Sequence, residues 1–472
     1  MNKPNVLLVI LDSVRAKNTS LLGYPRETTP KLENFAKNAT TYTNARAPGI
    51  HSISSHTSIF TGYHVAEHQA TSHGASLRPG HTVWEMLSGA GYRTGLFTPN
   101  AVVAESSNLS TFFQDVEGPR RNTLLFPEAL GPEDVPGRPS YLAYVWACLA
   151  SSSPIKSIGN GLARVLLESS AAHDPKREHG DEYVQKFLDW ITPSGGPWAA
   201  CINLMDAHYP YIPLEQFDRW GGETLQNFHR EAMGGPLTTQ YLGERPFWEL
   251  QAYENLYDDC ISQADACVGQ LLDHLKAANE LDNTLVVLTS DHGEGFGEYS
   301  VLNNNVRLID HSWGIGDEVS HVPLVVKYPG NSYQSTVDAP ASLTKFPSVV
   351  EAALCGKEED FVPENRMAIT TSYRVEEPGC SLPVPEQRKE SYFGPWHAVC
   401  TERSGGVVVD AVRREDSARY WPSVPKQAYS PRPDREFVES AVSDMKNKHV
   451  IGKEMELSSS VQERLETLGY VS

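Results

Sequence analysis

Two carboxylates and an imidazole follow apolar segments that lie far apart in the chain. Asp12 comes directly after the apolar run at residues 5–11, and Asp291 and His292 follow a second run at residues 284–290. Two carboxylates and one imidazole suit Mg²⁺, Mn²⁺ or Ca²⁺, and Zn²⁺ is a further option. An aspartate at a strand end often serves only as a turn or helix cap. Because the three residues occur together, we expect one divalent metal site.

A second feature is a segment rich in hydroxyl groups at residues 48–62, which reads Pro-Gly-Ile-His-Ser-Ile-Ser-Ser-His-Thr-Ser-Ile-Phe-Thr-Gly. It predicts the start of a helix, where unpaired N–H groups and the helix dipole favour an oxyanion. A serine-rich helix cap without chemistry is the alternative. This segment alone leaves both interpretations open.

The elements that must position these residues are buried strands. Runs of β-favouring apolar residues are typical of strands buried on both faces of a parallel sheet. Ligands of open α/β sheets bind beyond the carboxyl ends of the strands, so distant side chains should meet in one crevice. Three of the four runs are followed by Asp or His, the third case being Met205-Asp-Ala-His208. The runs are residues 5–11, 198–204, 284–290 and 322–328.

Amphipathic helices separate the strands. The clearest covers residues 258–276, and another should begin near Thr29-Pro30 with Leu32, Phe35 and Ala36 facing inward. The alternation predicts an α/β fold with a mainly parallel central sheet sandwiched by helices, and a small C-terminal antiparallel sheet.

Two regions are expected along the chain, a catalytic α/β domain at residues 1–340 and a smaller α+β subdomain with a helical tail at residues 341–472. Alternating apolar and polar residues predict the strands of the small sheet. These segments are residues 368–373, 397–401 and 406–412, with a turn at 404–406 and the helical tail at 460–468.

The pattern weakens at residues 118–182, which we interpret as an insertion over the sheet. It contains a short apolar piece, Tyr141-Leu-Ala-Tyr-Val-Trp-Ala-Cys-Leu-Ala150. A helix packed on the domain is the ordinary interpretation of such a piece, and contact with a membrane or lipid is the alternative.

Composition narrows the classes of function. The 472 residues include 40 basic and 59 acidic ones, and the net charge of −19 disfavours nucleic acid and anionic membrane surfaces unless a local patch reverses it. The seven cysteines form no Cys-x-x-Cys pair, so reduced thiols are expected. No signal peptide and no spanning helix are recognisable, which makes a cytoplasmic location the expectation. The oligomeric state stays open.

Taken together, these motifs resemble the sulfatase branch of the alkaline phosphatase superfamily. The resemblance extends from residue 5 to residue 330 in the order of the family. The matching segments are residues 5–15, Gly23-Tyr24, Thr28-Thr-Pro30, 52–62, 205–208, Ser290-Asp-His-Gly-Glu294, Asp310-His311 and 322–330.

The resemblance implies a metal held by Asp12, Asp291 and His292, with the nucleophile Ser52 as a further ligand. Sulfatases carry Cys or Ser at this position, with Pro two residues on and Arg four residues on, and the Cys is oxidised to formylglycine. Ser54 and His56 stand at the two downstream positions here, so no formylglycine is expected.

The sequence departs from the family pattern at two further places, and the first of them fits one subgroup. Ser13 replaces the second Asp of the Asp-Asp pair in typical sulfatases, and Thr98-Pro-Asn100 stands where the family has Lys-x-His. Sulfatase-like relatives and phosphoglycerol transferases with an unmodified Thr or Ser nucleophile tolerate the single carboxylate.

The resemblance also suggests roles for other residues. His208 and His311 are similar to family residues that contact the transferred group and the leaving oxygen, where a proton donor or a positive charge is needed. Asn100 and His56 are candidates for binding substrate oxygens. Arg15 could bind an anion, and a structural ion pair is an equal alternative.

The leading hypothesis is a metal-dependent hydrolase of sulfuric esters. Metal coordination would lower the pKa of Ser52, and the alkoxide would attack the bound ester to form a serine ester. The substrate would be a small-molecule, glycan-linked or lipid-linked sulfate or phosphate ester.

Other functions stay open. A serine ester must wait for water, so a phosphodiesterase or phosphoglycerol-type transferase on the same fold is the alternative. A two-metal phosphatase is less favoured, because only Asp206, His208 and His311 could supply further ligands. A degenerate binding protein is the last alternative, and the intact Asp12, Asp291 and His292 argue against it.

Overall fold

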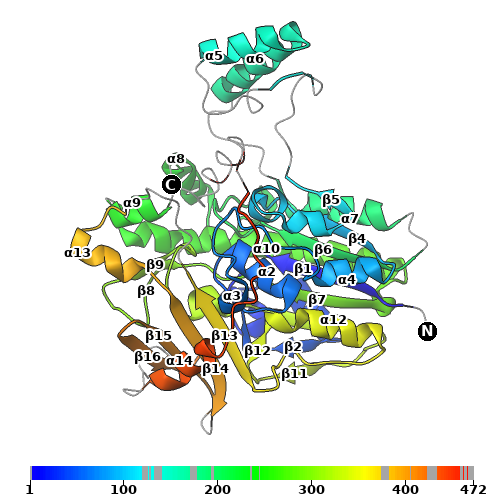
Figure 1. The fold of residues 1–472 in the computed structure, drawn as a ribbon, viewed down its shortest axis with the longest axis vertical. Coiled ribbons are helices and arrows are strands. Elements are labelled where there is room, and N and C mark those ends of the chain that lie inside the picture. The colour runs from blue at the N-terminus through cyan, green and yellow to red at the C-terminus, as the bar shows by residue number, and fades with distance from the viewer. Residues whose placement is uncertain are drawn as a thin grey trace.

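The computed structural model has one large sheet with helices on both faces and a smaller sheet beside it (Figure 1). Both sheets agree with the predicted fold class, which is confirmed. The structure describes residues 3–119, 126, 129–131, 141–170, 178–192, 196–233, 237–243, 245–373, 382–403, 406–422, 433–455, 457, 461 and 465.

The large sheet has eight strands in the order β11-β2-β10-β7-β1-β6-β4-β5. Strand β10 is antiparallel to both of its neighbours, and the other neighbouring pairs are parallel. The run at residues 322–328 therefore forms a strand, but in the reverse direction. The bounds are β1 (Asn5–Leu11), β2 (Thr40–Tyr42), β4 (Arg93–Phe97), β5 (Asp115–Glu117), β6 (Trp198–Leu204), β7 (Thr284–Thr289), β10 (Leu324–Lys327) and β11 (Ser335–Val337).

Strand β1 lies in the middle of this sheet and is buried throughout. Its alternate residues belong to two apolar cores, since Leu7 and Val9 join one core and Val6 and Leu8 join the other. Helices on both faces supply the rest of each core. The first core contains α1 (Pro30–Ala36), α7 (Gly180–Ile191) and α10 (Phe247–Ala277), and the second contains α2 (Ser52–Thr61), α4 (Val83–Gly89) and α12 (Phe346–Leu354).

Helix α1 starts at Pro30 as predicted, and Leu32, Phe35 and Ala36 are buried. Thr29 does not cap it with its side chain. Instead, the carboxylate of Asp265 on α10 accepts hydrogen bonds from the backbone N–H groups of Lys31 and Leu32, at 2.8 and 2.9 Å. The first turn of α1 is therefore satisfied by a neighbouring helix.

The small sheet is an antiparallel meander of four strands, β13-β14-β15-β16. The sequence predicted three of them and missed β16. The backbone of the small sheet is joined to the loop before α2, because the Thr371 N–H donates to the Pro48 carbonyl oxygen at 2.9 Å. The bounds are β13 (Met367–Ser372), β14 (Trp396–Arg403), β15 (Gly406–Arg413), β16 (Asp416–Tyr420) and the covering helix α14 (Arg435–Ser443).

The predicted insertion contains two helices, α5 (Tyr141–Ala150) and α6 (Pro154–Ser170). They form a hairpin drawn at the top of Figure 1, clear of the sheet and its covering helices. The expectation that this segment lies over the sheet is therefore wrong for α5 and α6. The predicted insertion also includes the start of α7, which does pack on the sheet through Tyr183 and Phe187.

Shorter elements complete the described chain. They are β3 (Ala45–Arg46), β8 (Phe296–Tyr299), β9 (Arg307–Ile309), β12 (Ala341–Ser342), α3 (Val65–His68), α8 (Glu223–Ala232), α9 (Leu237–Gly243), α11 (Asp317–Ser320) and α13 (Glu386–Lys389). Among the described residues, no helix has the length and apolar character that crossing a bilayer demands. The predicted turn at 404–406 and helical tail at 460–468 fall largely outside the described residues.

Candidate active site

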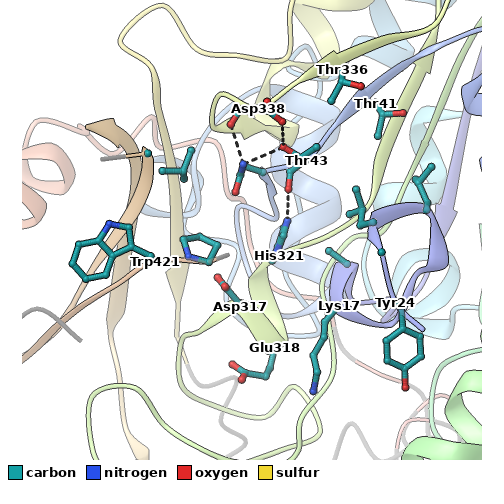
Figure 2. A pocket seen from close by; sticks show the side chains of 18 of the residues that line it. Lys17, Tyr24, Thr41, Thr43, Asp317, Glu318, His321, Thr336, Asp338 and Trp421 are labelled. Atoms are coloured by element: carbon teal, nitrogen blue, oxygen red, sulfur yellow. Dashed lines mark hydrogen bonds between the residues drawn. The ribbon is translucent and has the colours of Figure 1, made fainter. Parts of the chain in front are cut away.

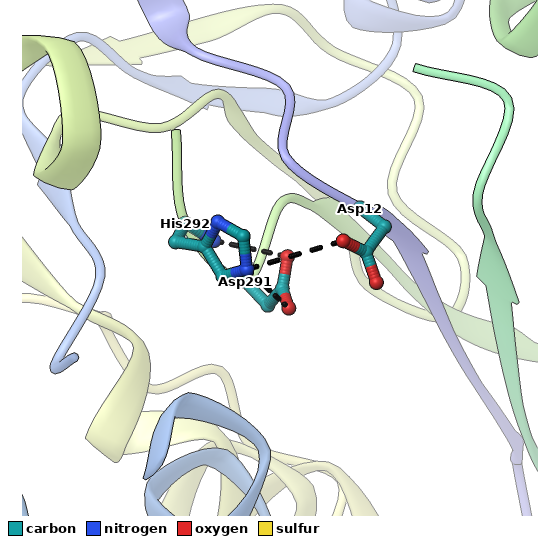
Figure 3. A group of neighbouring side chains, drawn as sticks. All are labelled: Asp12, Asp291 and His292. Carbon is teal, nitrogen blue, oxygen red and sulfur yellow. Dashed lines mark hydrogen bonds and ion pairs between the residues drawn. The ribbon is translucent and has the colours of Figure 1, made fainter. Parts of the chain in front are cut away.

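The ends of two neighbouring strands bring the predicted metal ligands together. Strands β1 and β7 are parallel neighbours with Ile10 opposite Thr289, so the residues that follow them leave the sheet side by side. Asp12, Asp291 and His292 are fully buried, and each offers a ligand atom within 4.8 Å of the other two (Figure 3). This spacing agrees with the geometry that one cation requires.

Hydrogen bonds fix the orientation of the three side chains. Asp12 Oδ2 accepts from the side-chain amides of Asn100 and Asn203, at 2.8 and 3.0 Å. Asp291 Oδ1 accepts from its own neighbour, the backbone N–H of His292, at 3.0 Å. The His292 Nδ1–H donates to the Gly293 carbonyl oxygen at 2.9 Å. Its Nε2 lone pair therefore faces the Asp291 carboxylate, with 3.4 Å between Nε2 and Oδ2.

The two carboxylates titrate in opposite directions. Burial would raise the pKa of Asp12, but the nearby imidazoles of His208 and His292 lower it to about 2. Burial and the charge of Asp12 raise the pKa of Asp291 well above its usual value. Asp291 Oδ2 is buried and accepts no hydrogen bond from the described residues. A pair of buried carboxylates with an unsatisfied oxygen is an environment that a cation would stabilise.

Ser52 is the first residue of α2 and lies against this group. Its Oγ accepts a hydrogen bond from Asn100 Nδ2 at 3.2 Å and is 3.5 Å from His292 Nε2. The other hydroxyl groups of α2 have partners elsewhere. Ser54, Thr57 and Thr61 bond to backbone carbonyls of the preceding turn, Ser55 bonds to the Asp291 carbonyl, and Ser58 pairs with His68. Ser52 is therefore the hydroxyl of α2 that faces the predicted metal site.

His56 lies one turn after Ser52 and is fully buried. Its Nδ1–H donates to the Ser52 carbonyl oxygen at 2.9 Å, and Nδ1 is 3.5 Å from Asp291 Oδ2. These contacts hold the start of α2 against Asp291. They give His56 a positioning role, and its predicted contact with substrate oxygens stays a prediction.

A second buried group lies beside the first. Glu294, Asp310 and His311 offer ligand-type atoms within 4.8 Å of one another. His311 Nδ1 is 2.5 Å from Asp310 Oδ1 and 3.7 Å from Glu294 Oε2. Burial opposes the charge of His311, but Asp310 and Glu294 raise its pKa well above the usual value. The His311 ring also lies 4.3 Å from that of His292, centroid to centroid. The raised pKa favours a protonated His311, held beside the Asp12, Asp291 and His292 group by the Asp310 carboxylate.

His208 reaches the same place from the end of β6. Its ring centroid is 5.3 Å from that of His311, and its Nδ1–H donates to the Tyr209 carbonyl oxygen at 2.7 Å. Burial lowers the pKa of His208, although the charge of Asp12 opposes this shift. The structure therefore brings His208, His311, Asn100 and Ser52 to one centre, as the sequence predicted.

Two contributions were missed by sequence reasoning. Asn203 was counted as part of the apolar strand β6, and its amide bonds to Asp12. A lone polar residue inside a buried strand is the signal that could have identified it. Glu294 and Asp310 were noted only as motif residues. Asp310 is the chain neighbour of His311, whereas Glu294 approaches His311 from another segment, a contact that no local pattern reveals.

Arg15 forms the structural ion pair that the sequence left open as an alternative. Its guanidinium is fully buried, is paired with Glu254, and is 2.7 Å from Glu298 Oε1. It also donates to the Glu294 carbonyl oxygen at 3.0 Å. Because carboxylates and a carbonyl engage its N–H groups, Arg15 braces the loop behind the site.

A separate pocket of about 1340 Å³ lies beside this centre (Figure 2). Lys17, Tyr24, Asp317 and Trp421 are among its lining residues, which include none of the predicted catalytic or metal-binding ones. It adjoins the centre at Glu318, whose carbonyl oxygen accepts a hydrogen bond from Glu294 N at 2.9 Å.

The comparisons with known proteins agree with the motifs. An N-acetylglucosamine-6-O-sulfatase of Bacteroides thetaiotaomicron is 29% identical over 127 residues, which cover 27% of this chain and 21% of that protein. An ulvan-active sulfatase of Formosa agariphila is 26% identical over 355 residues, or 72% of this chain and 59% of that protein. The chain thus spans less than two thirds of the length of both relatives.

Solved structures show the same fold. Phosphonate monoester hydrolase SpPMH from Silicibacter pomeroyi matches with a TM-score of 0.59 at 16% identity, covering 94% of this chain and 93% of that one. The family model described as Sulfatase matches residues 4–354, which is more than half of the sequence and contains the whole of the centre described above. The resemblance that the motifs indicated is confirmed, and this chain belongs to the sulfatase family.

Proposed function

We propose that the protein is a metal-dependent ester hydrolase that transfers a sulfuryl or phosphoryl group first to Ser52 and then to water. The observation that carries the proposal is the meeting of Ser52 Oγ with Asp12, Asp291 and His292 in one buried cluster. A nucleophile needs activation, and a nearby site for a cation is one way to provide it.

The residues present fit a divalent cation. Asp12 and Asp291 supply carboxylate oxygens, His292 supplies Nε2, and Ser52 Oγ adjoins them. Asp291 Oδ2 has no hydrogen-bond donor among the described residues, and the pKa values of Asp12 and Asp291 shift in opposite directions. Both observations support a pair of carboxylates that a bound cation would stabilise. When bound, the cation would supply charge that stabilises ionised Ser52 and the oxygens of the ester.

The protein side chains have distinct roles in the proposed reaction. Ser52 releases its proton to solvent, which returns one when the serine is freed, and its Oγ forms a bond to sulfur or phosphorus while the bond from that atom to the alcohol oxygen breaks. His311, held by Asp310 through Nδ1, gives a proton to the departing oxygen. Asn100 donates to the Ser52 oxygen and keeps it in place.

The serine ester is then hydrolysed. A water attacks the same sulfur or phosphorus atom, neutral His311 accepts the proton of that water, and the bond to Ser52 Oγ breaks. The products are the free serine, inorganic sulfate or phosphate, and a His311 ready for the next cycle. His208 faces the same centre and would contact the oxygens of the transferred group.

Transfer to an alcohol, or hydrolysis of a phosphodiester, is the second candidate function. The observation that favours it is the plain hydroxyl of Ser52 beside the neutral amide of Asn100. A serine ester has no second hydroxyl through which to expel its group, so an acceptor must enter the site from outside. An alcohol can play the part of water in that step.

A substrate panel distinguishes these functions. Chelator-treated protein is mixed with Mg²⁺, Mn²⁺, Ca²⁺ or Zn²⁺ and assayed on an aryl sulfate, a phosphate monoester and a phosphodiester, each with and without added glycerol. We expect turnover to require a divalent ion. Preference for the aryl sulfate supports the sulfatase, and products bearing glycerol support the transferase. Full turnover in the presence of chelator would refute metal dependence.

A further inference from the structure

Exposed apolar side chains concentrate on the hairpin of α5 and α6. Of eleven large apolar side chains that the described chain leaves exposed, six lie on these two helices. Trp146 is 72% exposed and Ile155 is 86% exposed, whereas such residues are scattered singly elsewhere. The six are Val145, Trp146, Leu149, Ile155, Ile158 and Leu162.

These side chains do not hold the hairpin together. The two helices meet instead through Tyr144, whose hydroxyl donates to the Ser157 carbonyl oxygen at 2.6 Å. The Tyr144 ring packs on Gly161, where an added Cβ would come within 2.3 Å of the ring. Among the side chains that the structure describes, the seam contains an aromatic ring, a hydroxyl group and a glycine, while the large apolar groups are exposed. This is the reverse of the usual amphipathic arrangement.

The charge of the segment differs from that of the protein. The chain carries −19, yet residues 119–177 contain seven basic and five acidic residues. Within residues 141–162 of the hairpin, the one charged residue is Lys156, which is exposed. A hairpin that is apolar and locally basic suits an anionic surface, and its distance from the body keeps the acidic remainder away from that surface (Figure 1).

We propose that α5 and α6 dock the protein on the surface of an anionic lipid bilayer. Trp146 and Leu149 of α5, with Ile155 and Leu162 of α6, enter the interfacial region, and Lys156 faces the headgroups. Helix α5 has ten residues and is about 15 Å long, half of what crossing the hydrocarbon core needs, so the hairpin lies in the interface.

A second copy of the chain fits the same face less well. Pairing two hairpins would bring two locally basic segments together and hold two strongly acidic bodies near one another. An anionic bilayer has the opposite charge to the hairpin and accepts its apolar side chains. The inference concerns a surface remote from the candidate active site and does not depend on the proposed function.

Vesicle flotation with the 472-residue chain tests the proposal. Vesicles of equal parts phosphatidylcholine and phosphatidylglycerol should carry the protein to the top of the gradient, and vesicles of phosphatidylcholine alone should carry much less. Withholding one large apolar side chain from the interface should lower partitioning by about tenfold. We expect this loss for Trp146→Ser and for Ile155→Ser.

Matched variants separate docking from general effects. Trp248 on α10 is also exposed, at 62%, so Trp248→Ser should leave flotation unchanged. Lys156→Glu should weaken binding to the anionic vesicles, and Lys446→Glu, at an exposed site on the body, should not. Absence of binding to anionic vesicles overturns the proposal. So does a solution dimer that Trp146→Ser converts to a monomer, because the face would then bind a second copy.

Discussion

Replacing Asp291 by asparagine should stabilise the metal-free protein and abolish its stabilisation by metal. Two ionised carboxylates whose ligand oxygens lie within 4.8 Å of each other repel by at least about 3 kcal/mol at an effective dielectric constant of about 20. The asparagine Oδ1 keeps the hydrogen bonds from Ser13 N and His292 N, and its N–H₂ replaces the oxygen that has no donor. Because part of the repulsion is already relieved by protonation, we expect a gain of about 1–3 kcal/mol.

The sign of the pH dependence follows from the raised pKa of Asp291. A carboxyl group whose folded pKa exceeds its unfolded value stabilises the fold at low pH, and this contribution is lost as pH rises through the folded pKa. The wild-type protein in chelator should therefore lose stability from acidic to neutral pH relative to Asp291→Asn. The advantage of the variant should be larger at neutral pH than at mildly acidic pH.

Urea unfolding of both proteins in chelator measures the difference. The control is Asp410→Asn, which alters a buried carboxylate bonded to Arg419 at 2.7 and 2.8 Å and should cost about 1–2 kcal/mol. With a divalent ion at about 100 times its Kd, the wild type should gain about 2.7 kcal/mol, and Asp291→Asn should gain much less. Two results together would refute the reasoning. Asp291→Asn would lose as much stability in chelator as the Asp410→Asn control, and the metal would stabilise Asp291→Asn as much as the wild type.

Three further predictions concern other residues. Asp310→Asn should lower kcat by about 10²–10⁴-fold with little change in KM, because His311 loses the carboxylate that orients it and keeps it protonated. Steady-state kinetics measure both constants. An unchanged kcat would show that His311 is not the general acid. Arg15→Lys should lower the free energy of unfolding by about 2–4 kcal/mol and leave KM unchanged, because lysine cannot bridge Glu254 and Glu298 as the guanidinium does. A variant that is as stable as the wild type but has a raised KM would instead indicate that Arg15 binds substrate. His68 is buried, its Nδ1 accepts from Ala70 N and its Nε2 bonds to Ser58, so burial lowers its pKa to about 3. Acidification from about pH 6.5 to about pH 5 should lower the free energy of unfolding of the wild type by about 2 kcal/mol more than that of His68→Gln, and an equal loss in parallel urea titrations would contradict this role of His68.

Much of the candidate site could be predicted because local sequence fixes it. An apolar run predicts a buried strand, and the residue after it necessarily lies at the strand end, which is why Asp12 and Asp291 were found together. The hydroxyl-rich segment likewise predicted the start of α2 at Ser52. Each of these signals is contained within a few neighbouring residues.

Other features depend on contacts between distant segments. The direction of β10 is set by its pairing with β7 and β2, which its composition does not encode. Helix α10 begins at Phe247, well before the predicted residue 258, because its first two turns are held by aromatic packing of Phe247 on Tyr241 and of Tyr253 on His229. The segment that forms α5 and α6 was expected to lie on the domain, since an apolar helix normally buries its apolar face. Helices α5 and α6 instead leave six large apolar side chains exposed.

Trapping the covalent intermediate tests the central claim most directly. The protein with its preferred metal is mixed with an excess of the best panel substrate, quenched in acid within the first turnovers, and analysed by peptide mass spectrometry. We predict a sulfuryl or phosphoryl group on the peptide that contains Ser52, and neither adduct nor turnover in Ser52→Ala, which should still be stabilised by metal. Near-normal turnover by Ser52→Ala without any adduct would contradict the account and favour direct attack by water.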